Sequence, residues 1–292
     1  MRLPPKDERC AKPAPVAAAR IGLSLIRQRI PGLAAARARL DQGGVWVHTD
    51  LMTPLGLRLY RYGFCEPEAY LLARLLRRGD VFIDGGANIG LFTLIGAATV
   101  GAHGRVLACE PSHETMTLLR ANVALNGFDW VDTYEIALAE RPGRLTLFGF
   151  GRGAGLSSFA PADRGGSHPR EVAVTTLDEL AAECFDLVRL VKLDIEGAEV
   201  RALRGAKELL AKARPFFVIE LEPAHLERQG SSASDLRAIF SEADYDAYRA
   251  VRRNGSVQLS RADFYGCPGT RNPNLVLRPR ERSSDTCIEV TS

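Results

Sequence analysis

The sequence lacks the patterns that mark several large classes of protein. Its six cysteines are dispersed and form no Cys-x-x-Cys pair, so neither a zinc site nor a disulfide framework is indicated. They stand at positions 10, 65, 109, 184, 267 and 287. A secretory signal is missing, and the apolar segment near the N-terminus is too short and too charged to span a bilayer. We therefore expect free thiols in a reducing cytoplasm.

Hydrolase motifs and a strongly basic domain surface are missing as well. No His-Glu-x-x-His motif and no Ser-His-Asp arrangement stands out. The net charge is +3, but residues 1–40 carry nine basic side chains against two acidic ones, so the other 252 residues have a net charge of −4. Because nucleic-acid grooves are strongly basic, we expect no nucleic-acid partner.

The basic segment separates an N-terminal arm from the rest of the chain. Residues 1–45 read as an arm that is helical or disordered, with a break at Pro31-Gly32, and 278–292 read as a polar tail. Three interpretations of the arm are open. It packs on the domain, it is a poorly ordered tail, or it binds the anionic inner face of a membrane. The alternation of apolar residues between Gly43 and Arg61 predicts a small hairpin that turns at 52–54.

Residues 81–90, Val-Phe-Ile-Asp-Gly-Gly-Ala-Asn-Ile-Gly, predict a buried strand that breaks into a glycine turn and opens a helix. The dinucleotide motif Gly-x-Gly-x-x-Gly is absent, because neither position 87 nor 88 is glycine. The spacing from Asp84 through Gly86 to Gly90 instead suits S-adenosylmethionine, whose charged amino-acid end needs a carboxylate and a close backbone. We expect the cofactor to contact Asp84, Gly85, Gly86, Asn88 and Gly90.

A second short strand over residues 105–109 ends in Glu110-Pro111, about 25 residues after Asp84. In a doubly wound sheet, an acidic residue at this place can accept hydrogen bonds from both ribose hydroxyls. The alternative is a carboxylate that caps the helix starting at Ser112. Taken with the glycine turn, the spacing predicts that Glu110 and Pro111 belong to the cofactor site.

Five ordered segments now indicate a known family. The chain resembles the FkbM-type S-adenosylmethionine-dependent methyltransferases over roughly residues 63–277, and Gly85 departs from it because the family usually has a β-branched residue there. The segments are Phe82-Ile-Asp-Gly-Gly-Ala-Asn-Ile-Gly, Ala108-Cys-Glu-Pro, Val174-Thr-Thr-Leu-Asp, Val191-Lys-Leu-Asp-Ile-Glu-Gly-Ala-Glu and Ile219-Glu-Leu-Glu-Pro. The resemblance implies O-methylation of a hydroxyl on a sugar, glycolipid or secondary metabolite. The alternatives are methylation of nucleic acid or protein, and a non-catalytic cofactor-binding module.

Alternating strand and helix signals predict an α/β fold. We expect a doubly wound, mostly parallel, seven-stranded sheet of the Rossmann-like class I methyltransferase type in a domain over residues 46–277. Its fourth and fifth strands are expected at 187–195 and 216–221, and a final antiparallel hairpin at 245–251 and 274–277. Residues 151–169 form the longest loop, which is a substrate lid or a surface loop.

The ends of the fourth and fifth strands supply the candidate catalytic residues. Asp194 is the preferred base, and it is also expected to contact the cofactor. A base is needed because a neutral hydroxyl must lose its proton to attack a sulfonium methyl group. Lys192 orients Asp194, or acts itself if burial lowers its pKa. Glu220 ends the fifth strand, and with Asp194 it either holds Mg²⁺ or accepts hydrogen bonds from a polyol acceptor. Mg²⁺ is therefore possible but not predicted, and the metal ligands stay unknown.

Other polar residues near these strand ends have a structural alternative. Glu196 and Glu199 take part in catalysis or stabilise the N-terminus of the next helix. His168 and His225 are alternative bases, with a structural role favoured for each. The expected partner is a small-molecule or glycan acceptor.

Overall fold

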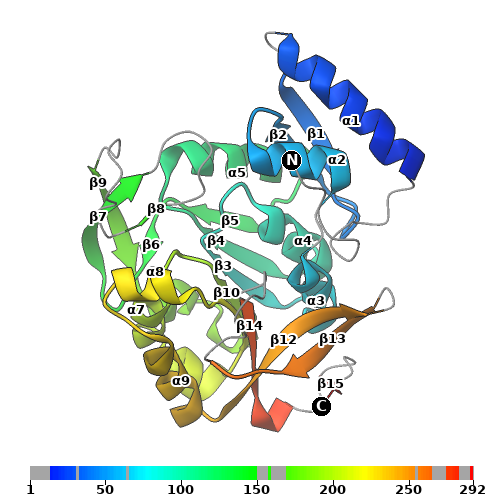
Figure 1. Cartoon of the computed structure of the whole chain (residues 1–292). Helices are drawn as coiled ribbons and strands as arrows, with labels where there is room; N and C mark the ends of the chain where they lie inside the picture. The colour runs from blue at the N-terminus through cyan, green and yellow to red at the C-terminus, as the bar shows by residue number, and fades with distance from the viewer. Residues whose placement is uncertain are drawn as a thin grey trace.

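The computed structural model describes residues 14–30, 33–63, 66–149, 157–158, 169–253, 256–264, 274–282 and 290–291, and they form an α/β fold (Figure 1). Five short strands lie parallel at its centre. They are β3 (Val81–Gly85), β4 (Arg105–Cys109), β5 (Val131–Tyr134), β10 (Val188–Leu193) and β11 (Phe216–Glu220). Every residue of β3 and β10 is buried, as expected for parallel strands with both faces covered.

The rest of the main sheet is largely antiparallel. Strand β14 (Asn274–Pro279) pairs with β11, and β12 (Tyr245–Arg253) pairs with β14. Strand β13 (Ser256–Arg261) pairs with β12, and β15 (Val290–Thr291) lies parallel to β13. The order is β15-β13-β12-β14-β11-β10-β3-β4-β5.

The predicted count of seven strands is wrong, because the described residues form nine in this sheet. The seven expected strands are all present, and β13 and β15 are additional. Strand β12 pairs with β14 only over Tyr245–Tyr248 and continues to Arg253. Strand β13 pairs with Tyr248–Arg253 along the opposite edge of β12, so the second half of β12 also has a partner.

Residues of the central strands pack alternately into two cores, one on each face of the sheet. Phe82, Leu190 and Phe216 face the first core, whereas Ile83 and Val191 face the second. The first core is covered by α3 (Pro67–Leu75) and α4 (Leu91–Val100), next to which lies α5 (His113–Asn126). The second is covered by α7 (Glu199–Arg204) and α9 (Ala233–Glu242). The sheet is therefore doubly wound, as predicted.

Shorter elements complete the second face. They are α6 (Leu177–Ala181), α8 (Pro223–Arg228), two 3₁₀ turns (Phe185–Leu187 and Arg280–Arg282) and a π-helical turn (Leu209–Ala213). Strand β14 runs past the expected start of the polar tail, and Arg278 within it is buried against the Tyr248 ring.

A second, four-stranded sheet follows β5 in the chain. Its strands are β6 (Ala137–Leu138), β7 (Gly143–Gly149), β8 (Ser157–Ser158) and β9 (Pro169–Thr175), in the order β6-β9-β7-β8. Most of the loop predicted over 151–169 lies outside the described residues, and so does His168.

The N-terminal segment holds α1 (Ala14–Arg29), β1 (Ala35–Arg39), β2 (Trp46–Asp50) and α2 (Pro54–Tyr62). The predicted hairpin is wrong in its second half: Thr53 caps a helix by accepting a hydrogen bond from Gly56 N at 3.0 Å, and Pro54 begins that helix. The true partner of β2 is β1, which lies inside the predicted arm.

Two amide side chains of α5 hold the β1–β2 hairpin. Asn126 accepts a hydrogen bond from Trp46 N at 2.8 Å and donates one to the Trp46 carbonyl at 2.7 Å. Asn122 accepts a hydrogen bond from His48 N at 2.7 Å, and its Nδ2 donates to the carbonyl of Ile89 at 2.7 Å. Ile89 lies in the glycine turn, so the same side chain contacts both segments.

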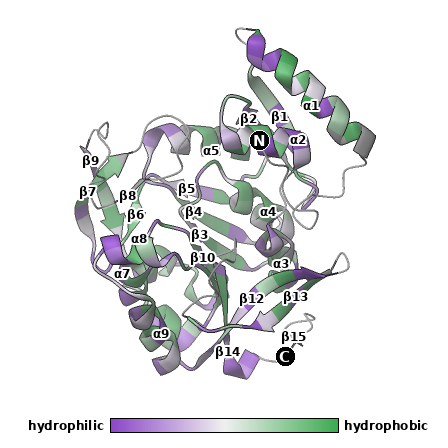
Figure 2. Ribbon diagram, viewed as in Figure 1, coloured by the Kyte–Doolittle hydropathy of each residue, from purple (hydrophilic) through white to green (hydrophobic). Residues whose placement is uncertain are grey.

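Helix α1 lies at the outer edge of the molecule, above the hairpin and α2 (Figure 1). Hydrophobic and hydrophilic residues alternate along it (Figure 2). Leu23, Ile26 and Ile30 are exposed. Among the residues that the structure describes, no helix is long and apolar enough to cross a membrane.

Candidate cofactor and acceptor site

The glycine turn after β3 is held between two neighbouring strands. Gly86 N and Ala87 N donate hydrogen bonds to the carbonyl of Cys109 at 3.0 and 2.9 Å. Gly86 has a φ of +75°, and a Cβ there would lie 1.9 Å from the carbonyl oxygen of Asp194. Only glycine fits this position, so the turn brings bare backbone to the carboxyl edge of the sheet.

The two flanking glycines are also enclosed. A Cβ on Gly90 would lie 2.6 Å from Leu119 Cδ1. A Cβ on Gly85 would lie 2.7 Å from Leu138 Cδ1 and 2.9 Å from Leu193 Cδ2. The departure from the family pattern at Gly85 thus has a physical reason, because two leucine side chains fill the space that a β-branched residue would need.

Glu110 follows β4 and faces the turn. Its Oε2 accepts a hydrogen bond from Asn88 N at 3.0 Å and its Oε1 accepts one from Ser112 N at 2.9 Å. The N-cap of α5 is Ser112, so Glu110 is not the cap. Burial raises the pKa of Glu110, and the two backbone N–H groups oppose that shift. Each carboxylate oxygen keeps a second lone pair with which to accept a ligand hydroxyl.

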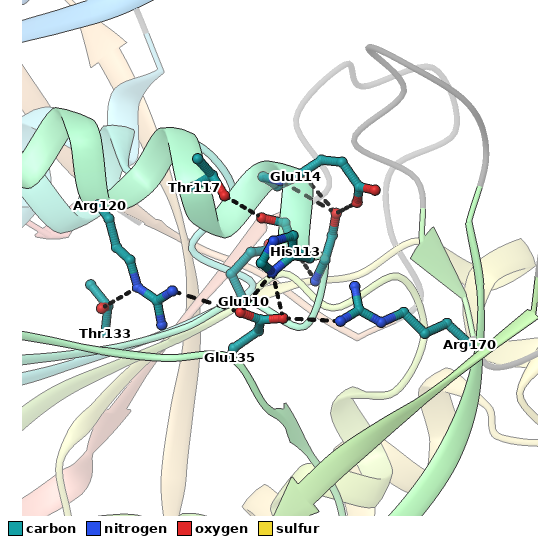
Figure 3. Close-up of polar contacts among 10 residues, drawn as sticks. Glu110, His113, Glu114, Thr117, Arg120, Thr133, Glu135 and Arg170 are labelled. Atoms are coloured by element: carbon teal, nitrogen blue, oxygen red, sulfur yellow. Dashed lines mark hydrogen bonds and ion pairs between the residues drawn. The ribbon is translucent and has the colours of Figure 1, made fainter.

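A charged network lies beside Glu110 (Figure 3). At its centre is Glu135, the residue that follows β5. Glu135 accepts a hydrogen bond from Arg170 of β9 at 3.3 Å, and His113 Nδ1 lies 3.0 Å from it. Arg120 is 3.7 Å from the other carboxylate oxygen. These contacts tie the second sheet to the start of α5. They are partly exposed, so each adds only about 0–1 kcal/mol.

Asp84 lies behind the turn rather than in it. It has no exposed surface, and its Oδ2 accepts a hydrogen bond from Thr93 Oγ1 at 2.6 Å. Lys192 Nζ lies 3.7 Å from its Oδ1. The prediction that Asp84 touches the cofactor therefore needs correction: a buried carboxylate acts on a ligand only through the groups that it holds in place.

Lys192 joins Asp84 to Asp194. Its Nζ lies 3.2 Å from Asp194 Oδ2 and 4.8 Å from the centre of the Phe92 ring. Burial by itself lowers the pKa of Lys192, but the charges of Asp194 and Asp84 outweigh burial and raise it. A raised pKa favours the protonated form, so these contacts favour the orienting role of Lys192 over the role of base.

Asp194 follows the last residue of β10, at the edge where ligands bind in open α/β sheets. Its backbone N–H donates to the carbonyl of Gly85 at 3.1 Å. Its side chain is 41% exposed, whereas that of Lys192 is only 4% exposed. The Asp194 carboxylate is thus held by the buried Lys192 ammonium and remains partly exposed to solvent.

Glu220 does not share its closest polar neighbours with Asp194. It ends β11, and its Oε2 lies 3.6 Å from His225 Nδ1, which in turn lies 2.9 Å from Glu196 Oε2. Burial and the charge of Asp194 raise the pKa of Glu220 to about 9 and that of Glu196 to about 8. Within the described part of the chain, the ligand atoms of Glu196, Glu220 and His225 lie close enough together to hold one ion, and Asp194 does not belong to this group.

Glu199 has the structural role that was the alternative for it. It is the first residue of α7, and its Oε1 accepts hydrogen bonds from Ile195 N at 2.9 Å and Gly197 N at 3.3 Å. Burial raises its pKa to about 7. The side chain therefore fixes the loop between β10 and α7.

Two supporting residues were not predicted from the sequence. Thr93 bonds Asp84, and Phe92 lies under the Lys192 ammonium. Thr93 is a buried polar residue in a largely apolar helix, whose other polar residue, Thr99, is only partly buried, and that mismatch is the signal that identifies Thr93.

The comparisons with known proteins identify the family of the chain. The profile of the methyltransferase FkbM domain matches residues 84–247, so the chain belongs to that family. Methyltransferase 1 of Beauveria bassiana is 29% identical over 146 residues, which cover 43% of this chain and 58% of that protein. Methyltransferase sdnD of Sordaria araneosa is 27% identical over 198 residues, 57% of this chain and 74% of that one.

A solved structure is similar at the level of the backbone. The methyltransferase FkbM from Methylobacillus flagellatus KT is 21% identical, with a TM-score of 0.44, and the match covers 73% of this chain and 50% of that one. The chain thus spans little more than half the length of the first curated relative and half of this structure. The family match and the two curated relatives support the class methyltransferase.

Proposed function

We propose that the protein transfers a methyl group from S-adenosylmethionine to a hydroxyl group of a sugar, glycolipid or secondary metabolite. The observation that carries this proposal is the half-exposed Asp194 carboxylate, which stands next to a glycine turn and is held by a buried ammonium. When bound, S-adenosylmethionine supplies an electrophilic methyl group on a sulfonium.

The residues around the turn fit such a molecule. Because Gly86 has no Cβ, the turn packs directly against the Asp194 backbone, so the turn and the Asp194 carboxylate lie at the same strand edge. Glu110 still has acceptor capacity for two hydroxyls after its two backbone hydrogen bonds. The negatively charged Asp194 is favourably placed for a cationic sulfonium.

Asp194 carries out the proton transfer in this proposal. Its carboxylate accepts the proton of the acceptor hydroxyl as the oxygen forms a bond to the methyl carbon and the sulfur–carbon bond breaks. The products are a methyl ether, S-adenosylhomocysteine and a proton on Asp194 that passes to water. Lys192 keeps the carboxylate oriented through its 3.2 Å contact. Holding both reactants at one strand edge supplies much of the acceleration.

The first test is binding and transfer with the purified full chain. Calorimetry should show that S-adenosylmethionine and S-adenosylhomocysteine bind, whereas NAD does not. A methyl-labelled cofactor mixed with a polar metabolite or glycolipid extract should then give a labelled methyl ether. Tighter binding of NAD would overturn the cofactor assignment, and binding without any transfer would leave only the cofactor-binding module.

A further inference from the structure

Three side chains with metal-binding atoms converge behind the acceptor side of the site. Glu220 comes from the end of β11, Glu196 from the loop after β10, and His225 from α8. One ligand atom of each lies within 4.8 Å of the other two. Carboxylate oxygens and an imidazole nitrogen at such distances can bind one ion at a common point.

The backbone around the three residues is arranged to bring them together. Glu196 has a φ of +56°, which is uncommon for a residue with a Cβ. A Cβ on Gly197 would lie 2.1 Å from the carbonyl oxygen of His225, so the loop and α8 are in direct backbone contact. Glu199 holds the loop in place through its hydrogen bonds to Ile195 N and Gly197 N.

Two buried atoms in the cluster lack hydrogen bonds. Glu220 Oε2 and His225 Nδ1 are both inaccessible to solvent, and neither has a hydrogen-bond partner among the described residues. His225 Nδ1 is 2.9 Å from Glu196 Oε2 and 3.6 Å from Glu220 Oε2, but without the alignment that a hydrogen bond requires. Buried polar atoms are almost always satisfied, so two adjacent exceptions need an explanation.

We propose that Glu196, Glu220 and His225 bind one divalent transition-metal ion, of which Mn²⁺ is the test case. The ion would satisfy both unpaired atoms. The two carboxyl groups would release their protons to water on binding and, as carboxylates, would balance the charge of the ion. The imidazole ligand favours a transition metal over Mg²⁺, which prefers an all-oxygen set. Two carboxylates with no thiolate suit Mn²⁺.

Three protein ligands leave coordination positions open. If the proposed function is correct, those positions lie at the same strand edge as Asp194, and they suit an acceptor that offers two neighbouring oxygen atoms. This consequence rests on the proposed function, whereas binding of the ion does not. An experiment can therefore disprove binding of the ion without disproving the proposed methyl transfer, and the reverse.

The test measures Mn²⁺ binding to the purified full chain after treatment with EDTA. Electron paramagnetic resonance of free Mn²⁺ and calorimetry should show one ion bound per chain. Mn²⁺ is chosen because the cysteines of the chain compete for Zn²⁺ through their thiolates. Binding should also raise the unfolding temperature of the wild type, since a ligand that binds the folded state stabilises it.

Glu220→Gln and His225→Gln should each weaken Mn²⁺ binding at least 10–100-fold, roughly the loss seen when even the residues surrounding a metal site are changed. Glu227→Gln is the matched control, because Glu227 is an exposed residue of α8 outside the cluster. Circular dichroism checks that each variant is folded. Absence of Mn²⁺ binding to the wild type, or equal binding by His225→Gln and the wild type, would overturn the proposal, and the wild-type result does not depend on any variant folding.

Discussion

In the proposed site, the half assigned to the cofactor and the half assigned to the acceptor are built in different ways. The cofactor half consists mainly of backbone, with Gly86 and Gly90 in left-handed conformations and Glu110 held by two N–H groups. The acceptor half consists of side chains from separate elements, with Asp194 and His225 among them. The first half needs a fixed chain path, and the second needs charged groups at fixed distances. Substitutions should therefore separate the two halves by what they damage.

The largest expected effect comes from Asp194→Asn in the acceptor half. The change keeps the size of the side chain but removes the proton acceptor, so turnover should fall by about 10²–10⁴-fold. Affinity for S-adenosylmethionine should change much less. Steady-state kinetics and calorimetry measure the two quantities. Asp186→Asn, an exposed residue at the other end of β10, is the control. Near-normal turnover of Asp194→Asn would make His225 the next candidate base.

Gly86→Ala tests the cofactor half through the backbone. A left-handed alanine costs about 1–2 kcal/mol, and here the new methyl group would also meet the Asp194 carbonyl oxygen at 1.9 Å. Gly127→Ala has the same conformational cost with no atom within 4 Å of the new group. Chemical denaturation should therefore show a larger loss for Gly86→Ala, together with lost cofactor binding. Equal losses in the two variants would contradict the close packing of the turn.

Glu110→Ala tests the same half through a side chain. Hydrogen bonds to charged groups contribute about 1.5–3 kcal/mol, so cofactor affinity should fall by about 10–150-fold. Turnover at saturating cofactor should change less than affinity. Glu114→Ala, in the exposed first turn of α5, should leave affinity unchanged. Calorimetry that finds no difference between the two variants would remove Glu110 from the cofactor site.

Glu199→Gln tests the loop between the two halves by its pH dependence. Burial raises the pKa of Glu199 from 4.5 to about 7. Between these two pH values, Glu199 keeps its proton in the folded state and has lost it in the unfolded state. The stability from this group is present below pH 4.5 and is lost as the pH rises through about 7. The decline is at most about 1.4 kcal/mol per pH unit. Denaturation across this range should show a shallower decline for Glu199→Gln, whose amide oxygen accepts the same hydrogen bonds.

The smallest effect is expected outside both halves, on deletion of residues 1–30. This change removes α1 but keeps the β1–β2 hairpin, so cofactor affinity should be unchanged. Stability should fall slightly, because Arg61 loses its buried hydrogen bond to Ser24 Oγ at 2.7 Å. Sedimentation with anionic vesicles at increasing salt distinguishes a packed arm from one that binds membranes. Loss of folding would contradict the view of α1 as an appendage.

The difference between the halves also explains what could be predicted from the sequence. The turn and Glu110 follow from spacing within about 25 residues, because parallel strands place their carboxyl ends at one edge. The side chains of Glu196 and His225 lie 2.9 Å apart, although the two residues are 29 positions apart in the sequence. No local pattern shows that pairing, which is why His225 was given a structural role.

Two errors in the fold have equally local causes. Leu55, Leu57 and Leu59 alternate as in a strand, but Thr53 and Pro54 are a stronger signal for a helix start. Strand β13 begins at Ser256, directly after Asn254-Gly255. This residue pair is typical of tight hairpins, so it predicts a strand after it, and that strand was not among those expected.

Asn122 has a consequence for the motions of the molecule. Its single amide holds His48 N on one side and the Ile89 carbonyl on the other. Fraying of the β1–β2 hairpin and opening of the glycine turn therefore break bonds to the same side chain. When a ligand rigidifies the turn, the amide hydrogen of His48 should exchange with solvent more slowly, although it lies in a different segment of the chain.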